Sequence, residues 1–168
     1  MPYTPIVGTL GYVWDTVTDR VLLVHRTARA SDDHLGKYNG LGGKLEADED
    51  VASGMMREIA EEALLTVTDM TLRGTVSWPG FGPNLEDWLG FVFLVTAWSG
   101  QAPERNDEGT LHWVERSRLL GKPSAEPLPM WDGDRYFLPL VFDSDPRQFH
   151  GFMPYHQGQP SAWSFRRL

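Results

Sequence analysis

The sequence predicts an α+β domain with a sandwich-like arrangement of strands and helices. Two helical segments, at about 50–63 and 134–144, have apolar, strand-like runs before, between and after them. Of the 168 residues, 41% are hydrophobic and 23% are charged, which is near the average for globular proteins. A chain of this length can bury one sizeable core, whereas two domains would each be marginal. We therefore expect residues 1–168 to form a single domain.

The first part of the chain should contain a hairpin, a loop and a glycine-rich turn. Residues 5–14 and 20–26 are apolar-rich, and the residues between them have turn composition, which favours a hairpin. Residues 27–38 are polar and are expected to form a loop. The sequence Gly-Leu-Gly-Gly at 40–43 is expected to be a turn that leads toward the first helix.

The first helix should span about Asp50–Ala63. Val51, Met55 and Ile59 recur at every fourth position, as expected for the buried face of a helix, and Met56 lies beside them. The second half of the chain should supply the other elements. These are long strands at 66–77 and 87–98 joined by a Pro- and Gly-rich loop at 79–83, a short strand at 111–114, a helical turn at 117–120, the second helix, and final strands at 149–155 and 162–167.

Composition and charge exclude several classes of protein. The chain has no cysteine, which excludes disulfides, thiolate metal sites and a cysteine nucleophile. No apolar run approaches the roughly 20 residues that span a bilayer, and no signal-like N-terminus is present, so we expect a cytoplasmic protein that does not bind membranes. The formal net charge is −8. Polymeric nucleic acid is therefore not an expected partner, although a small polyphosphate could bind through divalent cations.

Three glutamates lie on one face of the first predicted helix. At about 100° per residue, Glu61 lies roughly 60° from Glu58 on one side and Glu62 roughly 40° on the other. The carboxylates therefore flank and partly overlap the apolar stripe, where like charges repel one another and lose solvation. Arg57 supplies one positive charge, and divalent cations would supply the rest. Such a string alone is more often an ordinary charged surface, but the glycine pair and glutamate that precede it favour a functional site.

The segment from Gly43 to Leu65 resembles the Nudix signature. That signature is Gly, five residues, Glu, seven residues, Arg-Glu, an aliphatic residue, any residue, Glu-Glu, any residue, Gly and an aliphatic residue. The matching positions are Gly43, Glu49, Arg57, Glu58, Ile59, Glu61, Glu62 and Leu65. Leu64 departs from it, because the family has there a Gly that helps to end the helix. The resemblance implies a Nudix fold, which is a mixed β-sheet sandwiched between α-helices.

The resemblance also implies how the acidic residues act. Nudix enzymes hydrolyse a nucleoside diphosphate linked to another group, using Mg²⁺ or Mn²⁺. The implied metal ligands are Glu58, Glu61 and Glu62 with a carbonyl of Gly42 or Gly43, while Arg57 would orient the glutamates and Glu49 would support Arg57. The general base is either Glu58 or Glu108, since related enzymes bring a loop acid to the metal cluster. Glu108 could equally be a turn acid before a strand.

The substrate is indicated by resemblance outside the signature. Residues 37–44 (KYNGLGGK), which include Lys44, resemble a segment of MutT-type enzymes that clear oxidised purine triphosphates, as do 131–139 and 149–152. By this resemblance Asn39 contacts the base, and Thr9 and Arg26 align loosely with further pocket positions. Trp131 can stack on a purine, and Asp134 can read the base edge if it is protonated or faces a base N–H. Each has a structural alternative, such as core packing for Trp131 or a helix cap for Asp134. The related vertebrate enzymes have two adjacent acids where this chain has Gly133 and Asp134.

The leading prediction is a Mg²⁺-dependent pyrophosphohydrolase that converts 8-oxo-dGTP or a related purine triphosphate to the monophosphate and pyrophosphate. The alternatives are an ADP-ribose or dinucleotide pyrophosphatase, and a Nudix-like binding module without catalysis. A small nucleotide is the expected partner, and the protein is expected to be a monomer or homodimer. The five histidines, at positions 25, 34, 112, 150 and 156, lie at no metal-ligand spacing and are expected to be structural or exposed.

Overall fold

The computed structural model describes residues 1–122 and 126–168. The strands are β1 (Ile6–Asp15), β2 (Arg20–Arg26), β3 (Tyr38–Asn39), β4 (Leu41–Lys44), β5 (Thr66–Phe81), β6 (Glu86–Ser99), β7 (Gly109–Glu115), β8 (Phe149–Phe152), β9 (Tyr155–His156), β10 (Gln159–Pro160) and β11 (Ser164–Arg167). The helices are α1 (Val51–Ala63), α2 (Arg116–Leu119) and α3 (Asp134–Phe142). Among these residues, no helix is long and apolar enough to cross a membrane.

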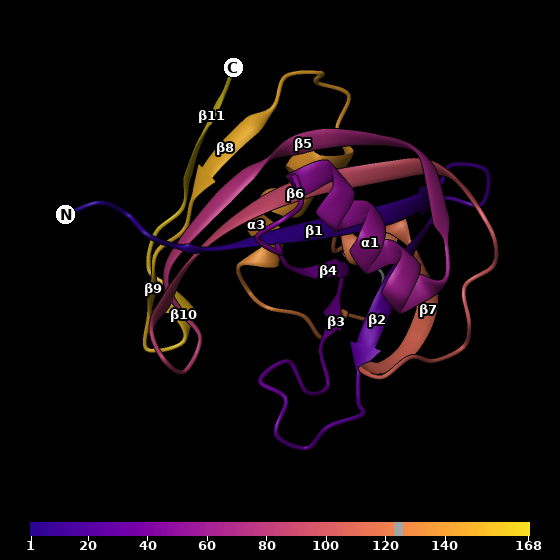
Figure 1. The fold of residues 1–168 in the computed structure, drawn as a ribbon, viewed down its shortest axis with the longest axis horizontal. Coiled ribbons are helices and arrows are strands. Elements are labelled where there is room, and N and C mark those ends of the chain that lie inside the picture. The colour runs from indigo at the N-terminus through magenta and orange to yellow at the C-terminus, as the bar shows by residue number, and fades with distance from the viewer. Residues whose placement is uncertain (123–125) are drawn as a thin grey trace.

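Nine of the described strands form one mixed sheet (Figure 1). Its main path runs β11-β8-β5-β6-β1-β2-β3, while β4 pairs with β1 and β7 pairs with β2. The β1·β6 and β5·β8 pairs are parallel, and the other pairs in this sheet are antiparallel. Because β1 pairs with β6 on one side and with β2 and β4 on the other, its central residues sit in the middle of the molecule.

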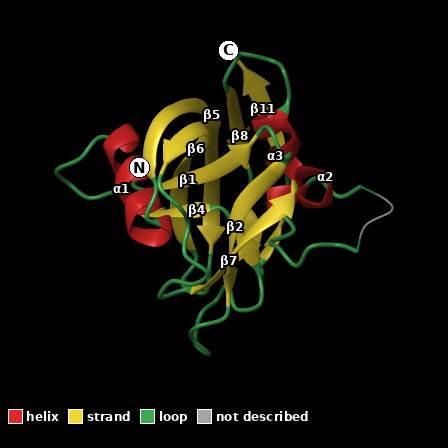
Figure 2. Ribbon diagram, turned by 90° about the vertical axis from the view of Figure 1, so that its right-hand side faces the viewer, coloured by secondary structure: helices red, strands yellow, loops and turns green. Residues whose placement is uncertain are grey.

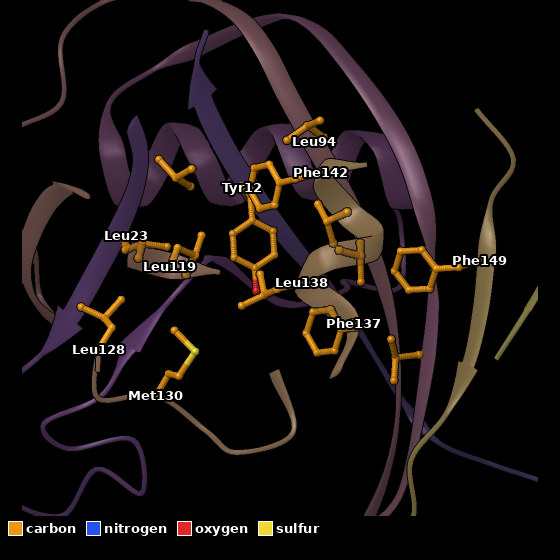
Figure 3. Close-up of a cluster of buried hydrophobic side chains, with 14 of the residues drawn as sticks. Tyr12, Leu23, Leu94, Leu119, Leu128, Met130, Phe137, Leu138, Phe142 and Phe149 are labelled. Atoms are coloured by element: carbon orange, nitrogen blue, oxygen red, sulfur yellow. The ribbon is translucent and has the colours of Figure 1, made fainter. Parts of the chain in front are cut away.

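The sheet is covered by helices on both faces, as Figure 2 shows. Alternate residues of β1 point to opposite sides, so that Tyr12 enters the core beneath α3 and Val13 enters the core beneath α1. In the first of these cores the Tyr12 ring meets the edge of Phe142 at a centroid distance of 5.9 Å (Figure 3). The predicted α+β class and the predicted sheet between helices are therefore confirmed.

Helix α1 lies close to the sheet because β1 contains a glycine beneath it. A Cβ on Gly11 would lie 2.8 Å from the sulfur of Met55 and 3.4 Å from Cδ1 of Ile59. Asp50 caps the helix by accepting hydrogen bonds from the backbone N–H groups of the residues two and three positions later. The helix ends at Leu64, which adopts the left-handed conformation (φ 55°, ψ 29°) that the family glycine would provide.

Three local predictions are wrong. Residues 41–44 form strand β4 rather than a turn, because their backbone pairs with residues 8–11 of β1. Strand β5 continues through the predicted loop as far as Phe81, with an irregular register between Trp78 and Phe81. Met56 does not join the apolar stripe, since it is 39% exposed. The β1–β2 hairpin, both helices and the long strands lie where the sequence predicts them, within a few residues.

Candidate active site

A cavity of about 330 Å³ opens at the meeting point of β1, β4, β5, β6 and the segment before α3. Its lining comes from distant parts of the chain. The lining residues are Gly8, Thr9, Leu10, Arg26, His34, Asn39, Gly40, Gly42, Gly43, Lys44, Trp78, Phe81, Trp88, Gly90, Glu108, Trp131, Asp134 and Tyr155. One end is formed by glycines and charged groups and borders α1, and the other end is largely aromatic. The two ends therefore differ in chemistry.

The charged end is organised by Arg57 of α1. Its guanidinium group donates to both carboxylate oxygens of Glu49, at 2.9 Å from Nε and 2.6 Å from Nη2. Its Nη1 atom also donates to Glu58 at 2.9 Å and to Glu61 at 3.2 Å. The Arg57 guanidinium lowers the pKa of Glu49 to about 2. Arg57 thus fixes Glu58 relative to the segment that leads into the helix.

Glu58 and Glu62 point inward, whereas Glu61 points toward solvent. The side chains of Glu58 and Glu61 are 13% and 60% exposed. Glu62 is buried, and one of its carboxylate oxygens accepts the Gly42 N–H at 3.0 Å. Gly43 packs so closely on this face that a Cβ there would lie 2.5 Å from Oε1 of Glu58. These two glycines therefore bring strand β4 against the helix carboxylates.

A further acid comes from the loop before β7. Arg26 of β2 donates to Glu108 at 2.9 Å. Burial raises the pKa of Glu62, and the carboxylates of Glu108 and Glu58 raise it further. Burial likewise raises the pKa of Glu58 despite its contact with Arg57. Glu58, Glu62 and Glu108 are thus close enough to repel one another electrostatically.

The donor chemistry at this end fits a divalent cation. Within residues 1–122 and 126–168, no three His, Cys, Asp or Glu side chains already converge as a metal-binding group. The carboxylates nevertheless lie partly buried beside one another, where an oxygen-seeking cation would relieve their repulsion. Glu58 and Glu62, with Glu108 opposite them, are the residues that could hold such an ion. Glu61 lies farther out, so the structure does not bring together all three predicted helix carboxylates.

The aromatic end contains Trp131, Phe81 and Tyr155 in edge-to-face contact. Phe81 lies 5.4 Å from Trp131 and 5.0 Å from Tyr155 between ring centroids. In the lining of the cavity, Thr9 Oγ1 and Asn39 Nδ2 are buried and have no hydrogen-bond partner within residues 1–122 and 126–168. Buried polar atoms are almost always paired, and an unpaired donor costs stability, so these two atoms are free to bind a ligand.

Asp134 faces the same end of the cavity. Burial raises the pKa of its carboxyl group to about 7. Gly133 is the residue before the helix, and none of the described side chains caps α3, so Asp134 is not the helix cap that the sequence allowed. A carboxylic acid with this pKa can donate a hydrogen bond near neutral pH and can accept one above it.

All six residues expected to bind substrate line this one cavity. They are Thr9, Arg26, Asn39, Lys44, Trp131 and Asp134. Sequence reasoning missed His34, Trp78, Phe81, Trp88 and Tyr155, which line it too. The unusual number of aromatic residues was the available signal, but it does not say which of them line a cavity. Phe81 in particular falls within the loop that the sequence predicts at 79–83.

The NUDIX domain profile matches residues 4–141 of this chain. The chain belongs to the Nudix family. It is 28% identical over 131 residues to the oxidized purine nucleoside triphosphate hydrolase of Mus musculus, covering 77% of this chain and 76% of that protein. It is 26% identical over 125 residues to the uncharacterized Nudix hydrolase YvcI of Bacillus subtilis, covering 73% of this chain and 72% of that protein.

The fold is also similar to solved structures. The MutT protein of Bacillus halodurans superposes with a TM-score of 0.77 at 27% identity, covering 95% of this chain and 97% of that one. This Nudix protein is therefore an enzyme of the pyrophosphohydrolase class. Nudix hydrolases generally use divalent metal ions.

Proposed function

We propose that this Nudix enzyme hydrolyses an oxidised purine nucleoside triphosphate, with 8-oxo-dGTP as the leading substrate, to the monophosphate and pyrophosphate. It would use Mg²⁺, act as a single domain in the cytoplasm, and keep the nucleotide pool free of damaged precursors of DNA. The supporting observation is the cavity with two chemically different ends, where acidic side chains border one end and unpaired polar atoms and aromatic rings line the other.

The acidic end suits a polyphosphate that is accompanied by cations. Glu58 and Glu62 would hold the metal together with Glu108 and a carbonyl of Gly42 or Gly43. Glu61, which faces solvent in this structure, would join them by turning inward when the cation binds. Arg57 keeps Glu58 in place through the contacts described above. A bound Mg²⁺ would polarise the phosphoryl oxygens and lower the pKa of the attacking water.

Two residues are candidates for the base that removes a proton from that water. Glu58 is the more buried of the two, with 13% of its side chain exposed against 28% for Glu108. Glu108 is oriented by Arg26. Single-turnover rates of Glu58→Gln and Glu108→Gln at saturating Mg²⁺ distinguish the base from a metal ligand. Loss of the base lowers the rate at every metal concentration, whereas excess Mg²⁺ can compensate for a weakened metal site.

The aromatic end suits a purine. Trp131 offers an indole ring for stacking, which contributes on the order of 1–3 kcal/mol per base. Thr9 Oγ1 and Asn39 Nδ2 offer polar contacts to a base edge, because neither atom has a hydrogen-bond partner among the described residues. Asp134 adds a group that can be an acid near pH 7. Lys44 and Arg26 line the same cavity and would lie toward the phosphates.

A substrate panel tests the proposal. The protein is incubated with Mg²⁺ and dGTP, 8-oxo-dGTP, ADP-ribose or diadenosine polyphosphate, and the products are separated by chromatography. We expect pyrophosphate release with the highest kcat/KM for the oxidised purine. If ADP-ribose is instead the preferred substrate and yields AMP and ribose phosphate, the proposed function would be replaced by that of an ADP-ribose pyrophosphatase. The absence of turnover with every substrate would leave a binding module.

Two variants test the metal assignment. Glu61→Gln and Glu62→Gln should each lower kcat at least tenfold, whereas Glu104→Gln, an exposed acid on a loop away from the cavity, should not. Added Mg²⁺ should raise the melting temperature of the wild-type protein, since a ligand that binds only the folded state stabilises it. The Glu62→Gln variant should show a smaller rise. An unchanged rate in both glutamine variants would contradict the assignment.

A further inference from the structure

The loop between β2 and β3 places one side chain against Trp131. The indole Nε1 of Trp131 donates a hydrogen bond of 2.7 Å to Nδ1 of His34, and the two rings meet edge to face at a centroid distance of 5.3 Å. An indole N–H can only donate, so Nδ1 of His34 must be the acceptor. The imidazole is therefore neutral, with its proton on Nε2.

A short chain of hydrogen bonds connects His34 to Arg26 of β2. Its backbone N–H donates to one carboxylate oxygen of Asp32 at 3.0 Å, and the other oxygen of Asp32 accepts from Arg26 at 2.8 Å. Arg26 also contacts Glu108 at the charged end of the cavity. The loop that carries His34 is thus anchored to β2 by a part-buried ion pair between Arg26 and Asp32.

The Trp131 indole needs the hydrogen bond to His34 to fix its orientation, because a second cavity also adjoins the ring. It lies before α3, outside any helix or strand, and so its backbone is not fixed by a ladder. A second cavity, of about 460 Å³, shares His34, Phe81 and Trp131 with the first. Lys37 Nζ lies 4.2 Å from the centroid of the indole ring but places no directional bond on it. Without the hydrogen bond to His34, the indole could turn toward the second cavity.

We infer that His34 is a positioning residue, whose Nδ1 atom holds the Trp131 indole in the orientation that stacks on the substrate base. The inference rests on the proposed function, in which Trp131 binds a purine. Burial lowers the pKa of His34, with a further contribution from Arg26, so the neutral form that can accept this hydrogen bond is favoured at neutral pH. Asp32 and Asp33 act in the opposite direction, and Lys37 adds to the lowering.

Two nearly isosteric substitutions isolate the acceptor atom. Asn places an oxygen at the same number of bonds from Cβ as Nδ1 of His, whereas Leu places a methyl group there. We therefore compare His34→Asn and His34→Leu with the wild type and with Trp131→Ala, using 8-oxo-dGTP and a ribose 5-triphosphate that lacks a base. Circular dichroism and melting temperature verify that each variant folds.

His34→Leu should raise the KM for 8-oxo-dGTP roughly two- to tenfold, the effect of one hydrogen bond, with kcat unchanged. His34→Asn should restore the wild-type KM within about twofold, and neither variant should change the KM for the base-free triphosphate. Trp131→Ala should raise the KM for 8-oxo-dGTP by roughly five- to a hundredfold.

Different results would overturn the positioning role of His34 and the base site at Trp131. Equal KM values in His34→Leu and His34→Asn would overturn the positioning role while Trp131→Ala still raises the KM. A rise in KM for the base-free triphosphate in His34→Leu would also overturn it, because the loop would then act on phosphate binding. An unchanged KM in Trp131→Ala would overturn the base site, and the role of His34 with it.

Discussion

The part-buried carboxyl group of Asp134 should make the stability of the protein depend on pH in an unusual direction. Most acids in proteins have lowered pKa values and stabilise the fold as pH rises. Asp134 has its pKa raised by burial from 3.8 to about 7, so the folded protein binds a proton that the unfolded chain has lost. Between these two values the free energy of unfolding should therefore fall as pH rises. Asp134→Asn should remove this dependence.

The size of the effect follows from the distance between the two pKa values. A separation of about 3 pH units at 1.36 kcal/mol per unit corresponds to about 4 kcal/mol over the whole range. Only the part above pH 5 is accessible without general acid denaturation, and Asp134 is partly open to the cavity, so solvent screening reduces it further. From pH 5 to pH 8 we expect the wild type to lose about 1–3 kcal/mol relative to Asp134→Asn.

Urea denaturation of both proteins at intervals between pH 5 and pH 8 measures this difference. Glu62 also has a raised pKa, but it is present in both proteins, so its contribution cancels when one curve is subtracted from the other. The free energy of unfolding of the wild type should fall relative to that of the Asn variant as pH rises from 5 to 8. Parallel curves over the whole range would show that Asp134 titrates as an ordinary exposed acid, and would refute the argument for a protonated base-reading group.

Three other substitutions give direct tests. Leu64→Gly should stabilise the protein by about 1 kcal/mol in urea denaturation, because Leu64 holds a left-handed conformation that costs a side chain more than it costs glycine. Arg73→Met should destabilise the protein by about 3 kcal/mol, since the buried guanidinium donates to four backbone carbonyls at the end of α3. The control is Arg20→Met, because the Arg20 side chain is exposed. Gly43→Ala should lower kcat about a hundredfold with the fold retained by circular dichroism, because the new Cβ would displace the Glu58 carboxylate; a normal rate would contradict the close approach of β4 to α1.

Local patterns made the first helix and its ion pairs predictable. The spacing of Val51, Met55 and Ile59 fixes which face is buried, and Arg57 lies one, four and eight positions from the glutamates it contacts, within reach on or just before the same helix. The hairpin of β1 and β2 was predictable for a similar reason, because a short turn joins two apolar runs. These features depend on residues that are near one another in the chain.

The features that could not be predicted depend on distant parts of the chain. Strand β4 has two glycines in four residues and resembles a turn, and only its pairing with β1 makes it a strand. Phe81 lies after a proline and a glycine, yet it is part of β5 and lies at the aromatic end of the cavity, because β6 still pairs with β5 at this residue. His34 reaches Trp131 across 97 positions of sequence. Nothing in the loop composition of residues 27–38 indicates that contact.

The two ends of the cavity meet different physical requirements, and Arg26 lies where they join. At the charged end, burial and the neighbouring carboxylates raise the pKa values of Glu58 and Glu62, so protons or cations would stabilise this end. At the aromatic end, the uncharged base of the proposed substrate would meet aromatic rings and the neutral side chains of Thr9 and Asn39. Arg26 gives one guanidinium nitrogen to Glu108 and another to Asp32, whose other oxygen anchors the loop that carries His34. A change in the charge at Glu108, such as the arrival of a metal-bound phosphate beside it, would therefore act on the same guanidinium group that anchors the His34 loop beneath Trp131.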